Sequence, residues 1–144
     1  MIAVDTTILV YAVGGEHPLR APSRELVSLA RDGLVRASTT VEVIQEFAHV
    51  RAKRRGRPEA VARAREYAVG LSPLLRPDRD DLFEGLELFE AVRGLGCFDA
   101  VLAATVRRRG WVLASADRSF GRLRDLDYVD PSSPTFVDDA LAAG

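Results

Sequence analysis

The sequence predicts an α/β domain built on a central, mainly parallel sheet with helices on both faces. Short apolar runs, typical of buried strands, alternate with longer segments whose apolar residues recur at helical spacing. This alternation favours a parallel sheet, because parallel strands are joined by crossover helices that cover it. The chain has 144 residues, 47% hydrophobic and 28% charged, as expected for one globular domain spanning residues 1–144.

Capping signals predict the helix boundaries in the first part of the chain. Ser23 suits the N-cap position of a helix that ends near Gly33. The pattern Thr39-x-x-Glu42 matches a capping box, which opens a helix that extends to about residue 54. In order, this part is predicted to contain a strand at 2–4, helices at 8–13 and 23–33, a strand at 34–37 and a helix at 39–54.

Glycine and proline divide the rest of the chain. Gly56 ends the preceding helix, and Pro58 suits the first turn of the next. Asp80 or Asp81 is expected to begin a later helix. The predicted order is a helix at 59–69, a helix from 80 or 81 to 94 or 96, a helix at 98–109 closed by Gly110, strands at 111–114 and 127–129, and a short tail.

Four acidic residues stand where an acid is unexpected. Asp5 and Asp117 follow predicted strands, at the sheet edge where ligands of parallel α/β proteins gather. On the third predicted helix, Glu46 lies on the side of its stripe nearest the apolar face, whereas Glu42 is assigned to the capping box. Asp99 heads an apolar stripe of its helix, although helix capping also explains an aspartate there.

Together these carboxylates predict one acidic pocket that binds a divalent metal ion. Buried carboxylates are costly unless they are paired or metal-bound, and clustered ones repel each other. Mg²⁺ or Mn²⁺ suits oxygen ligands, and Mg²⁺ keeps several waters while taking one or two direct carboxylates. One or two such ions can activate a water and stabilise developing charge on a phosphate.

The net charge of −1 excludes a protein that binds polyanions with its whole surface. All but one of the twenty basic residues are arginine, and they cluster in two runs. Each run is interpreted either as a local phosphate-binding patch or as solvated surface. The first run consists of Arg51, Lys53, Arg54, Arg55 and Arg57, and the second of Arg107, Arg108 and Arg109.

Several other classes are excluded or disfavoured by missing residues. The single cysteine, Cys97, excludes an intrachain disulfide and a Cys-rich zinc site. The chain has no apolar stretch long enough to span a membrane and no signal-type N-terminus, so we expect a cytoplasmic protein without a membrane partner.

The sequence also lacks the motifs of several known enzyme classes. A dehalogenase-like phosphohydrolase needs a second aspartate where Thr7 stands. The glycine motifs of dinucleotide-binding modules and P-loops do not occur, and no serine has a nucleophile-elbow context. His49 shares the stripe of Glu46, and whether it takes part in the chemistry is left open.

Four segments carry a family resemblance that covers nearly the whole chain. They are VDTTILVYA, STTVEVIQEFAHV, CFDAVLAATVRRRG and LASADRSF, followed by a last strand. In order and spacing they resemble the PIN-domain nucleases, and within these the VapC-type toxins of toxin–antitoxin pairs. The resemblance implies a PIN-like three-layer fold, metal binding and catalysis by Asp5, Glu46, Asp99 and Asp117, and Thr6 and Ser115 as small polar supports.

The same resemblance implies a Mg²⁺- or Mn²⁺-dependent endoribonuclease, usually dimeric, inhibited by a cognate antitoxin whose C-terminal segment occupies the site. Arg51, Lys53, Arg54 and Arg55 are then the expected RNA-binding residues. Two positions depart from the family pattern: Thr7 replaces a frequent Asn, and Ala116 replaces a frequent additional acid. The number of metal ions is therefore open. The alternative reading is a catalytically inactive PIN-like domain that binds RNA or protein.

A surface for partners is expected in the first half of the chain. Its helices carry more apolar residues than one small sheet can cover. On this basis we expect a homodimer and an antitoxin groove around Phe47, Tyr67, Leu71, Leu74 and Leu75.

Overall fold

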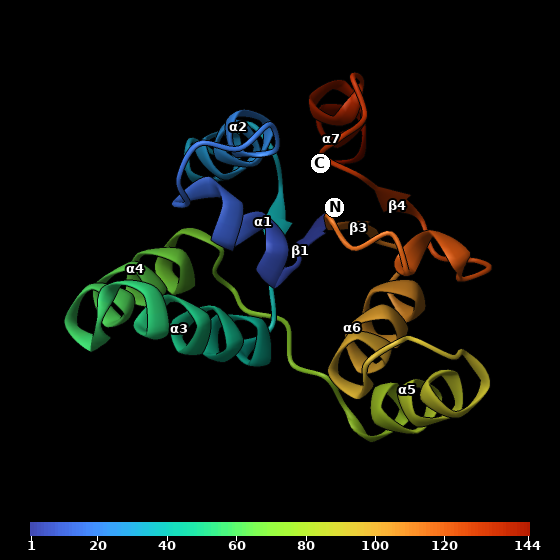
Figure 1. Cartoon of the computed structure of the whole chain (residues 1–144). Helices are drawn as coiled ribbons and strands as arrows, with labels where there is room; N and C mark the ends of the chain where they lie inside the picture. The colour runs from blue at the N-terminus through green and yellow to red at the C-terminus, as the bar shows by residue number, and fades with distance from the viewer.

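The computed structural model describes residues 1–144 and has a four-stranded, all-parallel sheet at its centre (Figure 1). The strands are β1 (Ile2–Val4), β2 (Ala37–Ser38), β3 (Val112–Ala114) and β4 (Tyr128–Val129), in the order β2-β1-β3-β4. In the register of β1, Ile2 lies opposite Ala37 on one side and opposite Val112 on the other. The predicted parallel α/β fold is confirmed.

Seven α-helices surround the sheet. They are α1 (Thr6–Ala12), α2 (Arg20–Arg31), α3 (Val41–Arg55), α4 (Arg57–Gly70), α5 (Arg79–Ala91), α6 (Cys97–Arg108) and α7 (Phe136–Ala143), with a 3₁₀ turn, η1, at Phe120–Arg122. Helix α3 packs on α4, α5 on α6, and α1 on both α2 and α3. No helix is long and apolar enough to cross a membrane.

The central strands show that both faces of the sheet are covered. Ile2, Ala3 and Val4 are all fully buried, although successive strand residues point to opposite faces. Such strands belong to sheets sandwiched between helices, which makes this a three-layer α/β fold. A close approach of α5 and α6 completes one side, because a Cβ on Gly85 would lie 2.7 Å from the Cα of Val101.

Helix starts differ from the sequence predictions by a few residues. Ser23 is not an N-cap: α2 begins at Arg20 after Leu19, and Ser23 is buried within the helix. The capping-box prediction is also wrong, since α3 is capped by Thr40, whose hydroxyl accepts from the N–H of Val43. Thr39 instead donates to the carbonyl of Val4 at 2.6 Å. Adjacent threonines compete for the cap, and a tertiary contact decides between them.

Three further boundaries differ from the prediction. The second strand lies at 37–38 rather than 34–37, and Leu34 is exposed. Helix α5 begins at Arg79, capped by Asp78, and it ends at Ala91. The expected tail is helix α7, whose Phe136 and Ala140 are buried. Weak local signals at these points are overridden by burial against the rest of the chain.

The apolar residues expected to form a partner surface belong to the core instead. Phe47 is fully buried, and Tyr67, Leu71 and Leu75 are each less than a tenth exposed. Phe47 and Tyr67 pack edge to face, with ring centroids 4.9 Å apart. The packing of α4 on α3 covers this side. Leu74, the remaining residue of the expected surface, is partly buried against the same core. The larger exposed apolar residues lie mainly on α5 and at the start of α6: Leu82, Phe83, Leu86, Phe89 and Phe98.

Candidate functional site

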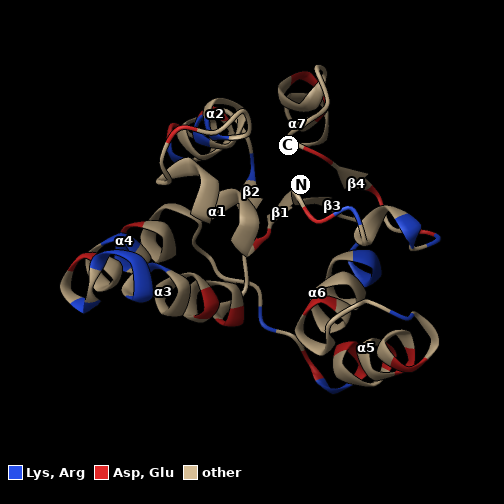
Figure 2. Ribbon diagram, viewed as in Figure 1, with Lys and Arg blue, Asp and Glu red and all other residues tan.

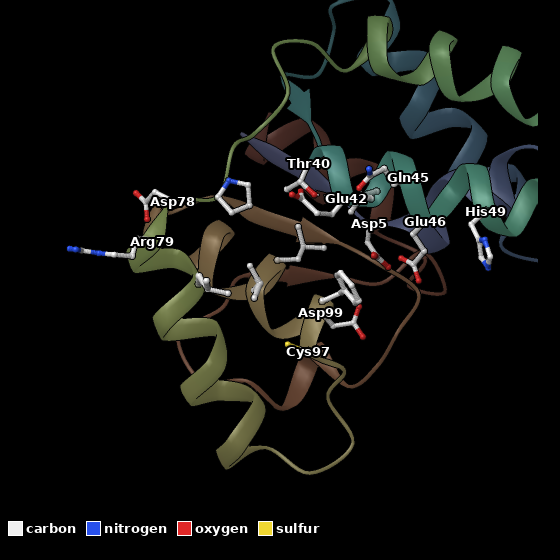
Figure 3. Close-up of a pocket in the computed structure, with 16 residues that line it drawn as sticks. Asp5, Thr40, Glu42, Gln45, Glu46, His49, Asp78, Arg79, Cys97 and Asp99 are labelled. Carbon is white, nitrogen blue, oxygen red and sulfur yellow. Dashed lines mark hydrogen bonds between the residues drawn. The ribbon is translucent and has the colours of Figure 1, made fainter.

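A pocket of about 800 Å³ opens between α3 on one side and α5 and α6 on the other (Figure 3). It contains three of the four predicted acids. Asp5, Glu46 and Asp99 face one another across the gap between α3 and α6 in Figure 3. Asp117 is not in the lining, but it follows β3, the strand beside β1. The carboxyl ends of the parallel strands thus bring together residues that are distant in the sequence.

Asp5 is the most deeply buried member of the group, with 3% of its surface exposed. It caps α1 directly after β1, and its Oδ2 accepts hydrogen bonds from the Ser115 hydroxyl at 2.6 Å and the Thr7 hydroxyl at 2.8 Å. Burial raises the pKa of Asp5, and the hydrogen bonds from Ser115 and Thr7 oppose that rise. No basic side chain forms an ion pair with it.

Two hydroxyl groups connect Asp5 to the loop that carries Asp117. The Thr7 hydroxyl donates to Asp5 and accepts from the backbone N–H of Ala116 at 2.9 Å. The Ser115 hydroxyl likewise donates to Asp5 and accepts from the N–H of Asp117 at 3.0 Å. Both hydroxyl protons are directed at Asp5, so these side chains orient the carboxylate and the loop together.

Thr7 is a site residue whose contribution the sequence does not reveal. In the sequence it is only a departure from a family pattern that has Asn at that position. The two hydrogen bonds of its hydroxyl explain how a threonine serves there without an amide. The one available signal is its position two residues after Asp5, in the first turn of α1, where a short polar side chain can bond back to an N-cap.

Glu46 is fixed by the predicted support residue Thr6. The Thr6 hydroxyl donates to Glu46 Oε2 at 2.5 Å and joins the start of α1 to the middle of α3. His49 lies one turn further along α3 and is an exposed lining residue of the same pocket. In Figure 3 its imidazole lies beyond Glu46, away from Asp5 and Asp99.

The pKa of Asp99 reflects its burial and the charges of the other three acids. Burial, followed by the negative charges of Asp5, Glu46 and Asp117, raises the pKa of Asp99 to about 6. A hydrogen bond with the backbone of Gly96 weakly opposes this rise in the pKa. Gly96 is the N-cap of α6, and a Cβ there would lie 2.8 Å from Asp99 Oδ2. The missing side chain of Gly96 therefore leaves space for the carboxylate.

The donor set fits a hard divalent ion that keeps most of its water. No three carboxylate, histidine or cysteine side chains lie close enough to form a ready-made ligand group. Mg²⁺ needs only one or two direct carboxylates, with the remaining acids bound through water. The mutual repulsion seen in the pKa of Asp99 is the second point of agreement, because a cation between the acids would relieve it.

The first basic run is divided by the structure. Arg51 is mostly buried, and its guanidinium binds both oxygens of Glu59, at 2.6 and 2.7 Å, and the carbonyl of Val13. This arginine holds α3 to α4 and has little capacity left for a phosphate. Lys53, Arg54 and Arg55 are exposed at the end of α3, and Figure 2 shows basic residues gathered where α3 meets α4.

The second basic run is bound to acids of α5. Asp81, which is fully buried, accepts from Arg108 at 2.8 Å and from Arg109 at 2.9 Å. Arg107 pairs with Glu84 at 2.7 Å. Glu84 therefore belongs to an ion-pair network rather than to a solvated acidic face. This run is neither a phosphate-binding patch nor solvated surface, because its guanidinium groups join α6 to α5.

Known proteins resemble this chain over most of its length. Residues 2–126 match the family model of the PIN domain. The chain is 47% identical over 139 residues to Ribonuclease VapC7 of Mycobacterium tuberculosis, covering 95% of this chain and 96% of the relative. It is 32% identical to Ribonuclease VapC23 and to Ribonuclease VapC13 of the same species, over 83% of this chain in each case and 100% and 92% of those relatives.

Proposed function

This chain belongs to the PIN-domain family, and we propose that it is a divalent-metal-dependent endoribonuclease acting as the toxin of a toxin–antitoxin pair. One observation carries the enzymatic part of the proposal. Asp5, Glu46 and Asp99 line one pocket where no basic side chain forms an ion pair with them, and the pKa of Asp99 is raised by burial and by the other acids. The relatives named ribonucleases support the choice of RNA as substrate.

The metal ion is Mg²⁺ or Mn²⁺, held by Asp5, Glu46, Asp99 and Asp117. When bound, such an ion activates a water and stabilises the negative charge that develops on the phosphate during in-line displacement. The chain supplies the orientation. Asp5 Oδ2 accepts from two hydroxyl groups, and Glu46 Oε2 accepts from Thr6, so one oxygen of each carboxylate is restrained while the other makes none of these hydrogen bonds.

Binding of the RNA backbone is assigned to Lys53, Arg54 and Arg55. These side chains begin one turn beyond His49 on the helix that carries Glu46, and they extend to the α3–α4 turn. A polyanion approaching an acidic pocket needs such cations nearby, and arginine binds phosphate with two parallel hydrogen bonds. Arg51 supports this surface indirectly, because its pairing with Glu59 holds the end of α3 against α4.

The test is cleavage of labelled RNA by the purified chain with Mg²⁺, with Mn²⁺, and with excess chelator. We expect cleavage with either metal and none with the chelator. The matched measurement is thermal unfolding, since an ion that binds only the folded state raises its stability. A chain that is neither stabilised by Mn²⁺ nor able to cleave any RNA would be an inert PIN-like binding domain.

Two partners complete the proposal. The cognate antitoxin is expected to bind the chain and block cleavage, which co-expression with the product of the adjacent small gene tests directly. A homodimer is expected to form through the exposed apolar residues of α5, among them Phe83, Leu86 and Phe89. Light scattering of the wild type and of a Phe83→Glu, Phe89→Glu double variant checks this. A monomeric wild type at micromolar concentration contradicts the dimer.

A further inference from the structure

Phe98 is placed in an unusual way for a large apolar residue. It is 79% exposed, more than any other large hydrophobic side chain of the chain. It lies in the first turn of α6, directly before Asp99, and both residues line the acidic pocket. An exposed aromatic ring at the mouth of a pocket does not stabilise the core. We therefore relate it to the molecule that the pocket binds.

The pocket itself has two chemically different parts. Asp5, Glu46 and Asp99 supply the acidic part, with Asp78 and Arg79 on the opposite side in Figure 3. The apolar part of the lining comes from three helices and the segment before α5: Val43, Pro77, Leu82, Phe98, Val101 and Leu102. The other lining residues are Thr40, Glu42, Gln45, His49 and Cys97. A metal ion and a phosphate use only the acidic part. The apolar part requires a flat or apolar group close to that phosphate.

Within RNA, the group next to every phosphate that meets this requirement is the base. A base stacks on an aromatic side chain through its π-face, whatever its sequence identity. A base in a duplex already uses both faces for stacking, so only an unpaired base can present one. We propose that Phe98 binds an unpaired base next to the scissile phosphate. This inference rests on the proposed ribonuclease activity.

The exposed residues of α5 serve as the internal comparison. Phe83, Leu86 and Phe89 are also exposed, but none of them lines the pocket. The guanidinium of Arg79 lies 5.9 Å from the centre of the Phe83 ring, so that ring already has a neighbour. Phe98 differs from them by sharing the pocket with the acids, and this difference separates a substrate contact from a protein contact.

The experiment compares Phe98→Ala and Phe98→Trp with the control Val69→Ala, a similarly exposed apolar residue of α4 that does not line the pocket. Phe89→Ala is included to report on the expected dimer surface. Each is measured in two ways: the KM for cleavage of a short single-stranded RNA with Mn²⁺, and the affinity of the same RNA for the matched Asp117→Asn variants, which are expected not to cleave it. From the strength of base–aromatic stacking, Phe98→Ala should lose roughly 10- to 100-fold in affinity. Phe98→Trp and Val69→Ala should remain close to the parent, and the Mn²⁺ affinity of each variant should equal that of its own parent protein.

Three results overturn the inference. One is a single-strand affinity of Phe98→Ala equal to that of the parent. Another is an equal loss for a duplex of the same sequence, which would show that stacking on an unpaired base is not the cause. The third is a loss shared by Phe89→Ala together with a change of oligomeric state, which would assign Phe98 to a protein interface. Wild-type protein that cleaves no RNA with either metal would instead refute the proposed function, and the binding measurement still tests Phe98.

Discussion

Two buried aspartates of this chain have opposite surroundings. Asp81 is fully buried and meets the guanidinium groups of Arg108 and Arg109 at 2.8 and 2.9 Å. Asp5 is 3% exposed and meets hydroxyl and backbone donors, with no cation among its partners. Asp81 also completes a capping box with Asp78 at the start of α5.

The comparison separates a structural acid from a functional one. Burying a charge is unfavourable unless an opposite charge accompanies it. At Asp81 the chain supplies that charge, and the result is a connection between α5 and α6. At Asp5 it does not, and other acids lie close by, which is the arrangement expected of a site that takes its cation from solution. Burial alone identifies neither role, whereas burial together with the sign of the neighbours identifies both.

The largest expected effect is on catalysis. Asp5→Asn and Asp117→Asn should each lower RNA cleavage by at least about 100-fold, because each removes a negative ligand from the metal site and with it several kcal/mol of transition-state stabilisation. Cleavage rates with Mg²⁺ and Mn²⁺ measure this, and circular dichroism should show an intact fold. A variant that cleaves at the wild-type rate has lost no metal ligand, and its residue would leave the site.

The second expected effect is on stability and concerns Asp81. Asp81→Ala should lower the free energy of unfolding by about 2 kcal/mol, less than for a fully enclosed pair because Arg108 and Arg109 reach solvent once released. Urea denaturation measures the change. Mn²⁺ affinity should stay at the wild-type value, and a large loss of that affinity would contradict the separation of the two regions.

The third predicted effect is a gain in stability rather than a loss. Since the folded-state pKa of Asp99 is about 6, above its ordinary value, the native protein keeps a proton that the unfolded chain releases. Stability of the metal-free protein should therefore fall as pH rises from about 4 to 6. Asp99→Asn should reduce this slope, although the raised pKa of Asp5 leaves part of it. It should also stabilise the metal-free protein at about pH 7.5 by on the order of 1 kcal/mol, a value reduced for the partial exposure of the group.

Denaturation of the chelator-treated wild type and variant across that pH range supplies the measurement. Added Mn²⁺ should raise the stability of the wild type more than that of the variant. Equal pH slopes for the metal-free wild type and variant would show that neither burial nor the other acids raise the pKa of Asp99 as described.

The smallest effect concerns the exposed basic residues. Replacing Arg54 and Arg55 with alanine should weaken RNA binding several-fold and reduce the slope of log affinity against log salt by about 0.7 for each phosphate that is no longer neutralised. A salt titration measures both quantities. Arg65→Ala, an exposed arginine of α4, is the control. Equal slopes in variant and wild type would assign the run to solvated surface or to the antitoxin.

The order of the main strands and helices could be predicted from the sequence, because apolar periodicity, glycine and proline are local signals. So could the four acids, since Asp5 and Asp117 follow strands, Glu46 borders the apolar face of a helix and Asp99 interrupts an apolar stripe. Their metal-binding role stays a prediction. Helix α7 was not predicted, because its few apolar residues indicate a helix only once they pack into the core, as Phe136 does.

By itself, then, the sequence determined the parallel α/β class, the family and which acids are candidates for the site. Only the tertiary structure decided how the charges are paired. It placed Arg107, Arg108 and Arg109 against Asp81 and Glu84, Phe47 in the core, and Thr7 between Asp5 and the Asp117 loop. These outcomes depend on which side chains from distant segments meet. The free energy of a buried charge or an apolar ring is set by those neighbours and not by its place in the chain.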